Sequence, residues 1–179
     1  MITIKRGDIT REEVGAIVNA ANTGLRGGGG VDGAIHRAAG PAVMEECRRI
    51  GGCPTGQAVM TGAGKLKAKK IIHTAGPVWS GGKRREPELL RECYENSFRL
   101  AKEAGLRSIA FPAISTGVYG YPIEAATRIA LAAGKKFEKD FDEVRFICFS
   151  DRDLEVYRRT WKNMRSPRSE IRVPKSPEF

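Results

Sequence analysis

A glycine run flanked by two asparagines and an aspartate is the part of this chain best suited to chemistry. Asn19 and Asn22 precede four consecutive glycines at 27–30, and Asp32 follows two residues later. Glycines add no side chains to a core and cost backbone entropy to order, so their use here is close approach of backbone N–H groups to a ligand. A helix that begins after them turns its positive dipole end toward the same place, which favours an anion. A carboxylate beside such a site indicates an enzyme that activates water next to a phosphate.

Two familiar phosphate-binding motifs do not fit this run. No Gly-Lys-Ser/Thr sequence closes it, so it is not a P-loop. The spaced glycines of dinucleotide-binding folds, with an acidic residue on the next strand, do not match either. A flexible surface loop is the structural alternative for any glycine cluster. We favour a ligand loop because the apolar segment 14–18 and a helical pattern from 32 would fix both ends.

A second segment of the same kind runs from Phe111 to Pro122. It joins a buried strand-like stretch, 108–111, to a helical stretch, 123–137, and it is rich in small and hydroxyl residues that offer hydrogen-bond donors. Ligands of parallel α/β sheets lie at the carboxyl ends of strands, where adjacent loops diverge. Two such loops on neighbouring strands could clamp a pyrophosphate between them.

The elements that must position these loops alternate along the chain. The apolar patterns predict strands over 2–5, 16–19, 58–61, 70–74, 108–111 and 144–149, and helices over 32–50 (with a break at 40–41), 87–104, 123–137 and 154–164. This alternation predicts a three-layer α/β/α domain with a mixed, largely parallel central sheet. We expect one domain over residues 1–165, and a basic, proline-containing tail over 166–179 that lacks periodicity and should be mobile.

Composition restricts the classes of partner and compartment. The 179 residues are 41% hydrophobic and 29% charged, as in ordinary globular domains. No apolar stretch reaches membrane-spanning length, and the first residues lack a secretion-signal pattern, so we expect a cytoplasmic protein without a membrane partner. The four cysteines are scattered and read as free thiols. His36 and His73 have no cysteine cluster beside them in the sequence, so neither a zinc site nor a Ser–His triad is expected.

The net charge of +10 fits a nucleotide, a nucleic acid or another polyanion as partner. The basic residues are spread widely and are not interleaved with aromatics. We therefore read them mainly as solvated faces, with weak non-specific nucleic-acid binding as a side effect.

Four segments together resemble the macro domains, specifically the MacroD-type ADP-ribosyl hydrolases. They are Gly-Asp-Ile-Thr at 7–10, Val-Asn-Ala-Ala-Asn at 18–22, the glycine-rich stretch 27–40, and Ile-Ser-Thr-Gly-Val-Tyr-Gly-Tyr-Pro at 114–122. The resemblance covers about residues 1–165. It implies a hydrolase that uses no metal and no cofactor and that acts on ADP-ribose and ADP-ribosylated proteins. We expect it to act as a monomer.

The resemblance also implies how the nucleotide end would be held. Asp8 would accept a hydrogen bond from the adenine amino group, with the Ile9 backbone nearby; the alternative is an N-cap of the turn at 9–12. Phe149 would lie against the adenine ring; the alternative is a core position. The remaining ligand-binding residues, mostly through their backbone around the diphosphate, would be Ala21, Gly29, Gly30, Val31, Ser115, Thr116, Gly117 and Val118.

At the distal ribose the resemblance implies the reactive groups. Asn22 would orient the hydroxyls, and Tyr119 would pack against the ring. Asp32 would position or deprotonate a water that attacks near the anomeric carbon, with an α-phosphate oxygen of the substrate sharing the task. The structural alternatives are a turn residue for Asn22, an exposed loop aromatic for Tyr119 and an N-cap of a helix over 33–39 for Asp32. The implied reactions are removal of mono-ADP-ribose from acidic side chains and deacetylation of O-acetyl-ADP-ribose. The alternative function is a reader that binds ADP-ribose without turning it over.

Overall fold

Six strands form one mixed sheet in the order β1-β6-β5-β2-β4-β3 within the computed structural model, which describes residues 1–165. The strands are β1 (Ile2–Arg6), β2 (Ala16–Ala21), β3 (Ala58–Gly62), β4 (Lys70–Ala75), β5 (Ser108–Phe111) and β6 (Glu143–Cys148). The helices are α1 (Gly30–Ala39), α2 (Pro41–Ile50), α3 (Glu86–Glu103), α4 (Ile123–Phe137) and α5 (Asp151–Arg165), with 3₁₀ turns η1 (Ile9–Arg11) and η2 (Glu138–Asp140). Only the β3–β4 pair is antiparallel. The predicted three-layer fold with a largely parallel sheet is confirmed.

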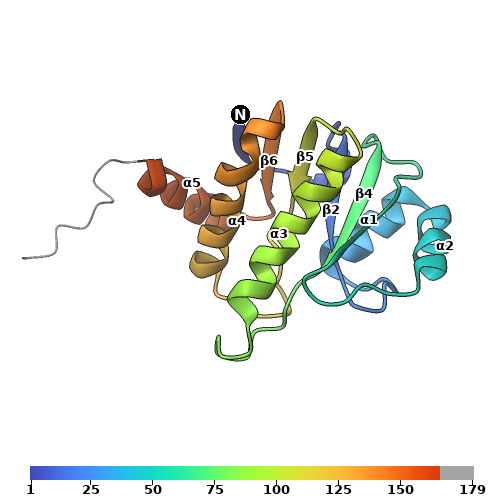
Figure 1. Ribbon diagram of the computed structural model, residues 1–179, viewed down its shortest axis with the longest axis horizontal. Helices are drawn as coiled ribbons and strands as arrows, with labels where there is room; N and C mark the ends of the chain where they lie inside the picture. The colour runs from blue at the N-terminus through green and yellow to red at the C-terminus, as the bar shows by residue number, and fades with distance from the viewer. Residues whose placement is uncertain (166–179) are drawn as a thin grey trace, which may run out of the picture.

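Two helical layers cover the sheet, with α3, α4 and α5 on one face and α1 and α2 on the other (Figure 1). Strand residues alternate between the layers, as a period of two requires. On β2 and β4, Val18 and Ile72 pack under the three-helix layer, whereas Ile17 and Ile71 pack under the two-helix layer. Both faces of the central strands are therefore apolar, which is why they read as continuous hydrophobic runs.

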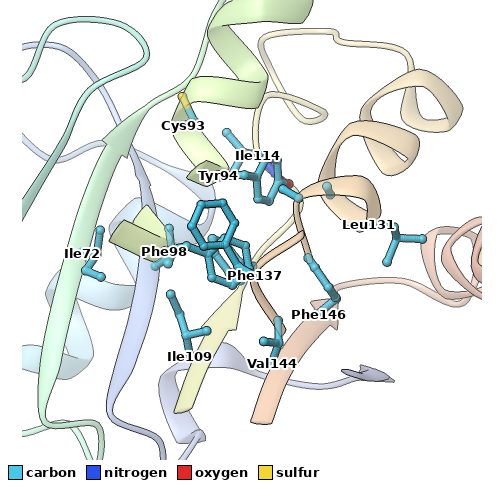
Figure 2. Packing of buried hydrophobic residues seen from close by; sticks show 14 of the residues in the cluster. Ile72, Cys93, Tyr94, Phe98, Ile109, Ile114, Leu131, Phe137, Val144 and Phe146 are labelled. Carbon is cyan, nitrogen blue, oxygen red and sulfur yellow. The ribbon is translucent and has the colours of Figure 1, made fainter. Parts of the chain in front are cut away.

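An aromatic cluster centred on Phe98 of α3 forms the larger core (Figure 2). Its ring centroid lies 4.8 Å from that of Phe111, 5.0 Å from that of Phe137 and 5.5 Å from that of Phe141. Phe98 and Phe137 are stacked with an interplanar angle of 4°. This cluster joins α3, α4 and β5, and so fixes the strand from which the second ligand loop departs.

The element boundaries differ from the predicted ones in two places that matter for the site. Helix α1 begins at Gly30, two residues earlier than expected, and β6 ends at Cys148, which leaves Phe149 outside the strand. The expected tail, 166–179, lies outside the described residues. Within residues 1–165, no helix combines the length and apolar character needed to cross a membrane. All four cysteines are buried and free, as predicted.

Replacing Phe98 with alanine should lower the free energy of unfolding by about 3–5 kcal/mol, because a fully buried ring leaves a cavity among three other rings. Phe149→Ala is the matched control: the same change at a side chain that is 90% exposed should alter stability by no more than about 0.5 kcal/mol. Urea unfolding measures both. Equal effects of the two substitutions would mean that the aromatic cluster does not stabilise the fold.

Candidate functional site

The predicted ligand residues follow the carboxyl ends of four neighbouring parallel strands. Asp8 follows β1, Phe149 follows β6, the loop 112–122 follows β5, and the loop 22–29 follows β2. These strands are adjacent in the order β1-β6-β5-β2. Neighbouring strands lie about 4.8 Å apart, so this row of four strand ends, from β1 to β2, spans about 14 Å. The chain thus brings together, along one edge of the sheet, residues separated by up to 141 positions in the sequence.

The glycine loop leaves open space at the start of α1. Gly29 is the N-cap of that helix, and a Cβ built on Gly29 or Gly30 would meet no atom within 4 Å. Gly33 is different: a Cβ added there would collide with the Gly28 carbonyl oxygen, so the helix packs directly on the loop backbone. The first N–H groups of a helix have no intrahelical partners and carry its positive dipole end. The loop therefore presents donors into an unobstructed space that suits an anion.

Asn22 shapes the same loop. Its Nδ2 donates to the Gly27 carbonyl oxygen at 2.8 Å, and its Oδ1 accepts from the Arg26 backbone N–H at 3.0 Å. The turn role, which the sequence left as the alternative, is therefore what the structure contains. A Cβ on Gly28 would lie 4.0 Å from Asn22 Nδ2 and 3.5 Å from Asp32 Oδ2, so both polar side chains lie next to Gly28.

Asp32 is a buried carboxylate, 6% exposed, in the first turn of α1. The structural alternative, an N-cap of a helix over 33–39, is wrong, because α1 already begins at Gly30 and has no side-chain cap bond. Its Oδ1 instead accepts from Asn19 Nδ2 at 2.7 Å and lies 3.4 Å from His36 Nε2. Oδ2 is directed toward Gly28. One oxygen is thus held by the protein, and the other is turned toward the glycine loop.

A chain of polar side chains continues behind Asp32 into the two-helix side of the sheet. Asn19 Nδ2 also lies 3.1 Å from His73 Nδ1, and His73 Nε2 lies 2.9 Å from Thr61 Oγ1. Asn19, His73 and Thr61 belong to β2, β4 and β3, and all are 3% exposed or less. Burial, with His36 as a second cause, lowers the pKa of His73 to about 4, so the ring is neutral at pH 7.

The structure places a cysteine next to both histidines, although no cysteine cluster lies near either of them in the sequence. Ligand-type atoms of His36, Cys47 and His73 all lie within 4.8 Å of one another. The two ring nitrogens of His73 are already in contact with Asn19 and Thr61, and burial raises the pKa of the Cys47 thiol. The group is therefore an internal hydrogen-bonded cluster in this structure.

The second loop carries two marks of a functional segment. Ser115 has φ +65°, a left-handed conformation that is unfavourable for a residue with a side chain. Its buried Oγ has no hydrogen-bond partner among the described residues. A Cβ added to Gly76, after β4, would collide with this Oγ, so the loop packs against a glycine that cannot be replaced without movement. Strain and an unpaired polar atom of this kind concentrate at ligand sites.

A third segment supports Tyr119. The Trp79 backbone N–H donates to the Tyr119 carbonyl oxygen at 2.9 Å. The buried Glu86 carboxylate in turn accepts from the backbone N–H groups of Ser80, Gly82 and Arg84. Although burial opposes it, these bonds together lower the pKa of Glu86. Tyr119 itself is partly buried, so the alternative of an exposed loop aromatic is wrong.

The β1 and β6 end of the row is open. Asp8 caps η1: its Oδ1 accepts from the Thr10 backbone N–H at 3.0 Å and from Thr10 Oγ1 at 2.7 Å, and the Thr10 hydroxyl is the main cause of a lowered pKa. The cap, one of the two roles considered for Asp8, is present, and the other carboxylate oxygen, Oδ2, lies 3.8 Å from Arg11 Nε in an exposed ion pair. Phe149 is 90% exposed, so the alternative of a core position is wrong.

The remaining residues predicted to bind the ligand also lie at this edge of the sheet. Ile9 and Ala21 are buried at the ends of the loops, and Val118 is fully exposed at the tip of the second loop. No neighbouring atom obstructs Gly117, while Thr116 Oγ1 donates to the Ala113 carbonyl oxygen at 3.3 Å. The structure thus gathers all the predicted site residues at one sheet edge; their roles toward a ligand stay predictions.

Comparison with known proteins agrees with this arrangement. The family model of the macro domain matches residues 18–130. The chain belongs to the macro domain family. A macro domain-containing protein of Chlorobaculum tepidum is 57% identical over 157 residues, which are 86% of this chain and 91% of the relative. A Salmonella newport relative named O-acetyl-ADP-ribose deacetylase is 53% identical over 88% of this chain and 92% of its own length.

Solved macrodomains share the fold closely. A mutant Oceanobacillus iheyensis macrodomain with ADPR has a TM-score of 0.86 and 44% identity, and the match covers 90% of this chain and 91% of that one. A Trypanosoma brucei macrodomain in complex with ADP-ribose has a TM-score of 0.83 and 46% identity, covering 88% and 68%.

The macro domain site contains partners of Asp32 that the sequence reading missed. Asn19 was noted only as the start of the glycine segment, and the two histidines were set aside for want of cysteines nearby in sequence. Both histidines lie in the polar cluster behind Asp32, together with Thr61. A signal did exist: Asn19, His73 and Thr61 are polar residues in otherwise apolar strand segments, and buried polar groups require partners.

Stability of the macro domain should fall between pH 7 and pH 5 by about 2 kcal/mol on account of His73 alone. Its pKa is about 4 when folded against 6.5 ordinarily. Below pH 6.5 the unfolded chain therefore takes up a proton that the folded chain refuses. Urea unfolding at both pH values, on wild type and His73→Asn, isolates this effect, because the carboxylates titrate alike in both. The same pH dependence in the two proteins would contradict it.

Proposed function

We propose that this macro domain binds ADP-ribose along the row β1-β6-β5-β2 and hydrolyses bonds to its distal ribose. The order of chemical groups along the sheet edge carries the proposal. From β1 to β2 the row presents an apolar ring beside a carboxylate, two donor-rich loops, and a carboxylate next to an amide. ADP-ribose has the same order: an aromatic base with an amino group, a diphosphate, and a ribose. The relatives whose names or titles mention ADP-ribose or O-acetyl-ADP-ribose support this assignment.

At the base end, the exposed Phe149 ring offers an apolar face, and the exposed Oδ2 of Asp8, which the cap does not use, can accept from an amino group. Adenine supplies both a flat ring and such an amino group. The diphosphate then lies between the start of α1 and the loop at 115–118, where the open glycines Gly29, Gly30 and Gly117 leave room for it. Helix N-termini favour anions of this type.

At the ribose end, Asp32 is placed to act on water. Its Oδ1 is fixed by Asn19, so the carboxylate cannot rotate freely, and Oδ2 remains directed at the space over Gly28. A water on Oδ2 would be oriented or deprotonated as it attacks near the anomeric carbon, with a substrate phosphate oxygen sharing the task. For a glutamate-linked substrate, the bond between the anomeric carbon and the side-chain oxygen breaks. The water oxygen becomes the anomeric hydroxyl of ADP-ribose, one water proton passes to Asp32, and the side chain leaves as a carboxylate.

We propose two substrate classes for this site: proteins that carry mono-ADP-ribose on aspartate or glutamate, and O-acetyl-ADP-ribose. Both join an acyl oxygen to the distal ribose, so both place a hydrolysable carboxylic ester beside Asp32. The experiment that tests the activity is incubation with a glutamate-linked mono-ADP-ribosylated protein, following release of ADP-ribose. A wild-type protein that binds ADP-ribose but never releases it would be a reader, and the hydrolase proposal would be overturned.

Asp8→Asn separates adenine binding from the cap. Asparagine caps helices as well as aspartate does, so the Thr10 bonds and the unfolding temperature should be retained. The charge on the adenine acceptor is lost, and the affinity for ADP-ribose should fall by about 1.5–3 kcal/mol. Isothermal titration calorimetry measures this. An unchanged dissociation constant would leave Asp8 with the capping role alone.

Asp32→Asn should slow turnover of the glutamate-linked substrate by about 10²-fold or more, the usual scale for a positioned base. The amide keeps an oxygen for the Asn19 bond, so folding is preserved, and affinity for free ADP-ribose should change little or tighten as a charge near the diphosphate is removed. Glu45→Gln, at an exposed carboxylate of α2, is the control. Full hydrolysis by Asp32→Asn would mean that the substrate phosphate activates the water unaided.

A further inference from the structure

The polar chain behind Asp32 runs across three strands and contains a histidine that cannot touch a ligand. We propose that His73 is a positioning residue for Asp32: with its proton on Nε2, it holds the Asn19 amide in the one orientation that offers an N–H to the carboxylate. This inference rests on the proposed hydrolase function of Asp32, and it adds Thr61 and His73 to the residues on which turnover depends.

The contacts define the direction of each hydrogen bond. Asn19 Nδ2 is 2.7 Å from Asp32 Oδ1 and 3.1 Å from His73 Nδ1. An amide nitrogen is a donor only, with two hydrogens. The carboxylate accepts the first hydrogen, so the second must go to His73, and His73 Nδ1 must be the bare nitrogen of a neutral ring.

The other side of the ring completes the assignment. A neutral imidazole with a bare Nδ1 carries its proton on Nε2, which lies 2.9 Å from Thr61 Oγ1. The Thr61 hydroxyl donates onward to the Gly62 carbonyl oxygen at 2.8 Å, so its oxygen is free to accept from the ring. Every proton in the chain Gly62–Thr61–His73–Asn19–Asp32 is therefore directed by the backbone carbonyl at its start.

The opposite tautomer of His73 would reverse the hydrogen bond between His73 and Asn19, and so change what Asn19 offers to Asp32. A proton on Nδ1 of His73 would face the Asn19 amino group, and the amide would have to turn so that Oδ1 accepted it. Asn19 Oδ1 would then also face Asp32 Oδ1, so that two acceptor oxygens would lie against each other with no hydrogen between them. Asp32 would lose its 2.7 Å donor and gain a repulsive neighbour.

Two further observations support this reading. Asn19 Oδ1 is buried and has no hydrogen-bond partner among residues 1–165, which is unfavourable. This orientation is nevertheless required if both amide hydrogens are to reach Asp32 and His73. The groups that face the His73 ring are Asn19, Thr61, His36 and Cys47, and none is a carboxylate that would stabilise a protonated ring. The ring therefore stays neutral, in line with its low pKa.

Thr61→Val, with Thr61→Ser as the matched control, tests the proposal. Valine has nearly the same shape but removes the acceptor for Nε2–H, and serine retains it. Thr61→Val should lower kcat for the glutamate-linked substrate about 10-fold or more, the scale on which outer-shell partners act elsewhere, with KM unchanged. Thr61→Ser should keep the wild-type kcat to within about twofold. Equal kcat values for the two variants, both folded by thermal unfolding, would overturn the proposal.

The tautomer can be read directly. Long-range ¹H–¹⁵N correlation spectra distinguish a protonated from a bare ring nitrogen, and wild-type His73 should show the proton on Nε2. A proton on Nδ1 in the wild type would overturn the proposal whatever the kinetics. Because this measurement needs no substrate, it separates failure of the tautomer assignment from failure of the hydrolase function, which Asp32→Asn tests on its own.

A second pair of variants, at His73, tests the proposal independently in case Thr61→Val does not fold. In His73→Asn, the amide oxygen takes the place of the bare Nδ1 and can accept from Asn19, whereas His73→Leu offers no acceptor. His73→Asn should retain at least about fivefold more turnover than His73→Leu. Equal loss in both would show that the ring contributes packing alone and would overturn the positioning role.

Discussion

A single buried hydrogen bond, from Asn19 to Asp32, ties the sheet to the helix that carries the candidate site. A carboxylate that is 6% exposed is costly unless donors satisfy it, so the position of α1 relative to β2 is determined by where this donor lies. The glycine loop between them has to accommodate that distance. Gly33 against the Gly28 carbonyl is the consequence, since no residue with a side chain would let the helix approach so closely.

The second loop depends on the same edge of the sheet but is held differently. Its strand, β5, is fixed by the aromatic cluster around Phe98, on the face opposite to the Asp32 cluster. The two loops thus lie side by side while each is anchored in a different core. Such an arrangement can hold the two loops at a constant spacing without direct bonds between them, which suits a site that must leave room for a diphosphate.

Much of the fold followed from the sequence because its signals are local. Apolar runs bounded by turn residues gave the strands, and helical spacing gave the helices, to within a few residues. The glycine run and the hydroxyl-rich loop stood out for the same reason. The partners of Asp32 could not be predicted in this way, because β3 and β4 come close to Asp32 only when the strands pair. His73 is 41 positions from Asp32 in the sequence, and Thr61 is 29. The left-handed conformation of Ser115 could not be predicted either, since the loop that contains it packs against Gly76, 39 positions away in the sequence.

The pairing of β1 with β6 has a consequence for the order in which the molecule is made. Ile2 lies opposite Val144, and β1 has no other partner among the described strands, so β1 can form its ladder only after β6 has been made. Contacts that join distant parts of a chain close large loops and form late. Asp8 and Phe149, at the open end of the row, come from these two strands. During synthesis on the ribosome the glycine loop can therefore be made well before the β1–β6 end of the row, and the whole edge can assemble only after Phe149 has been added.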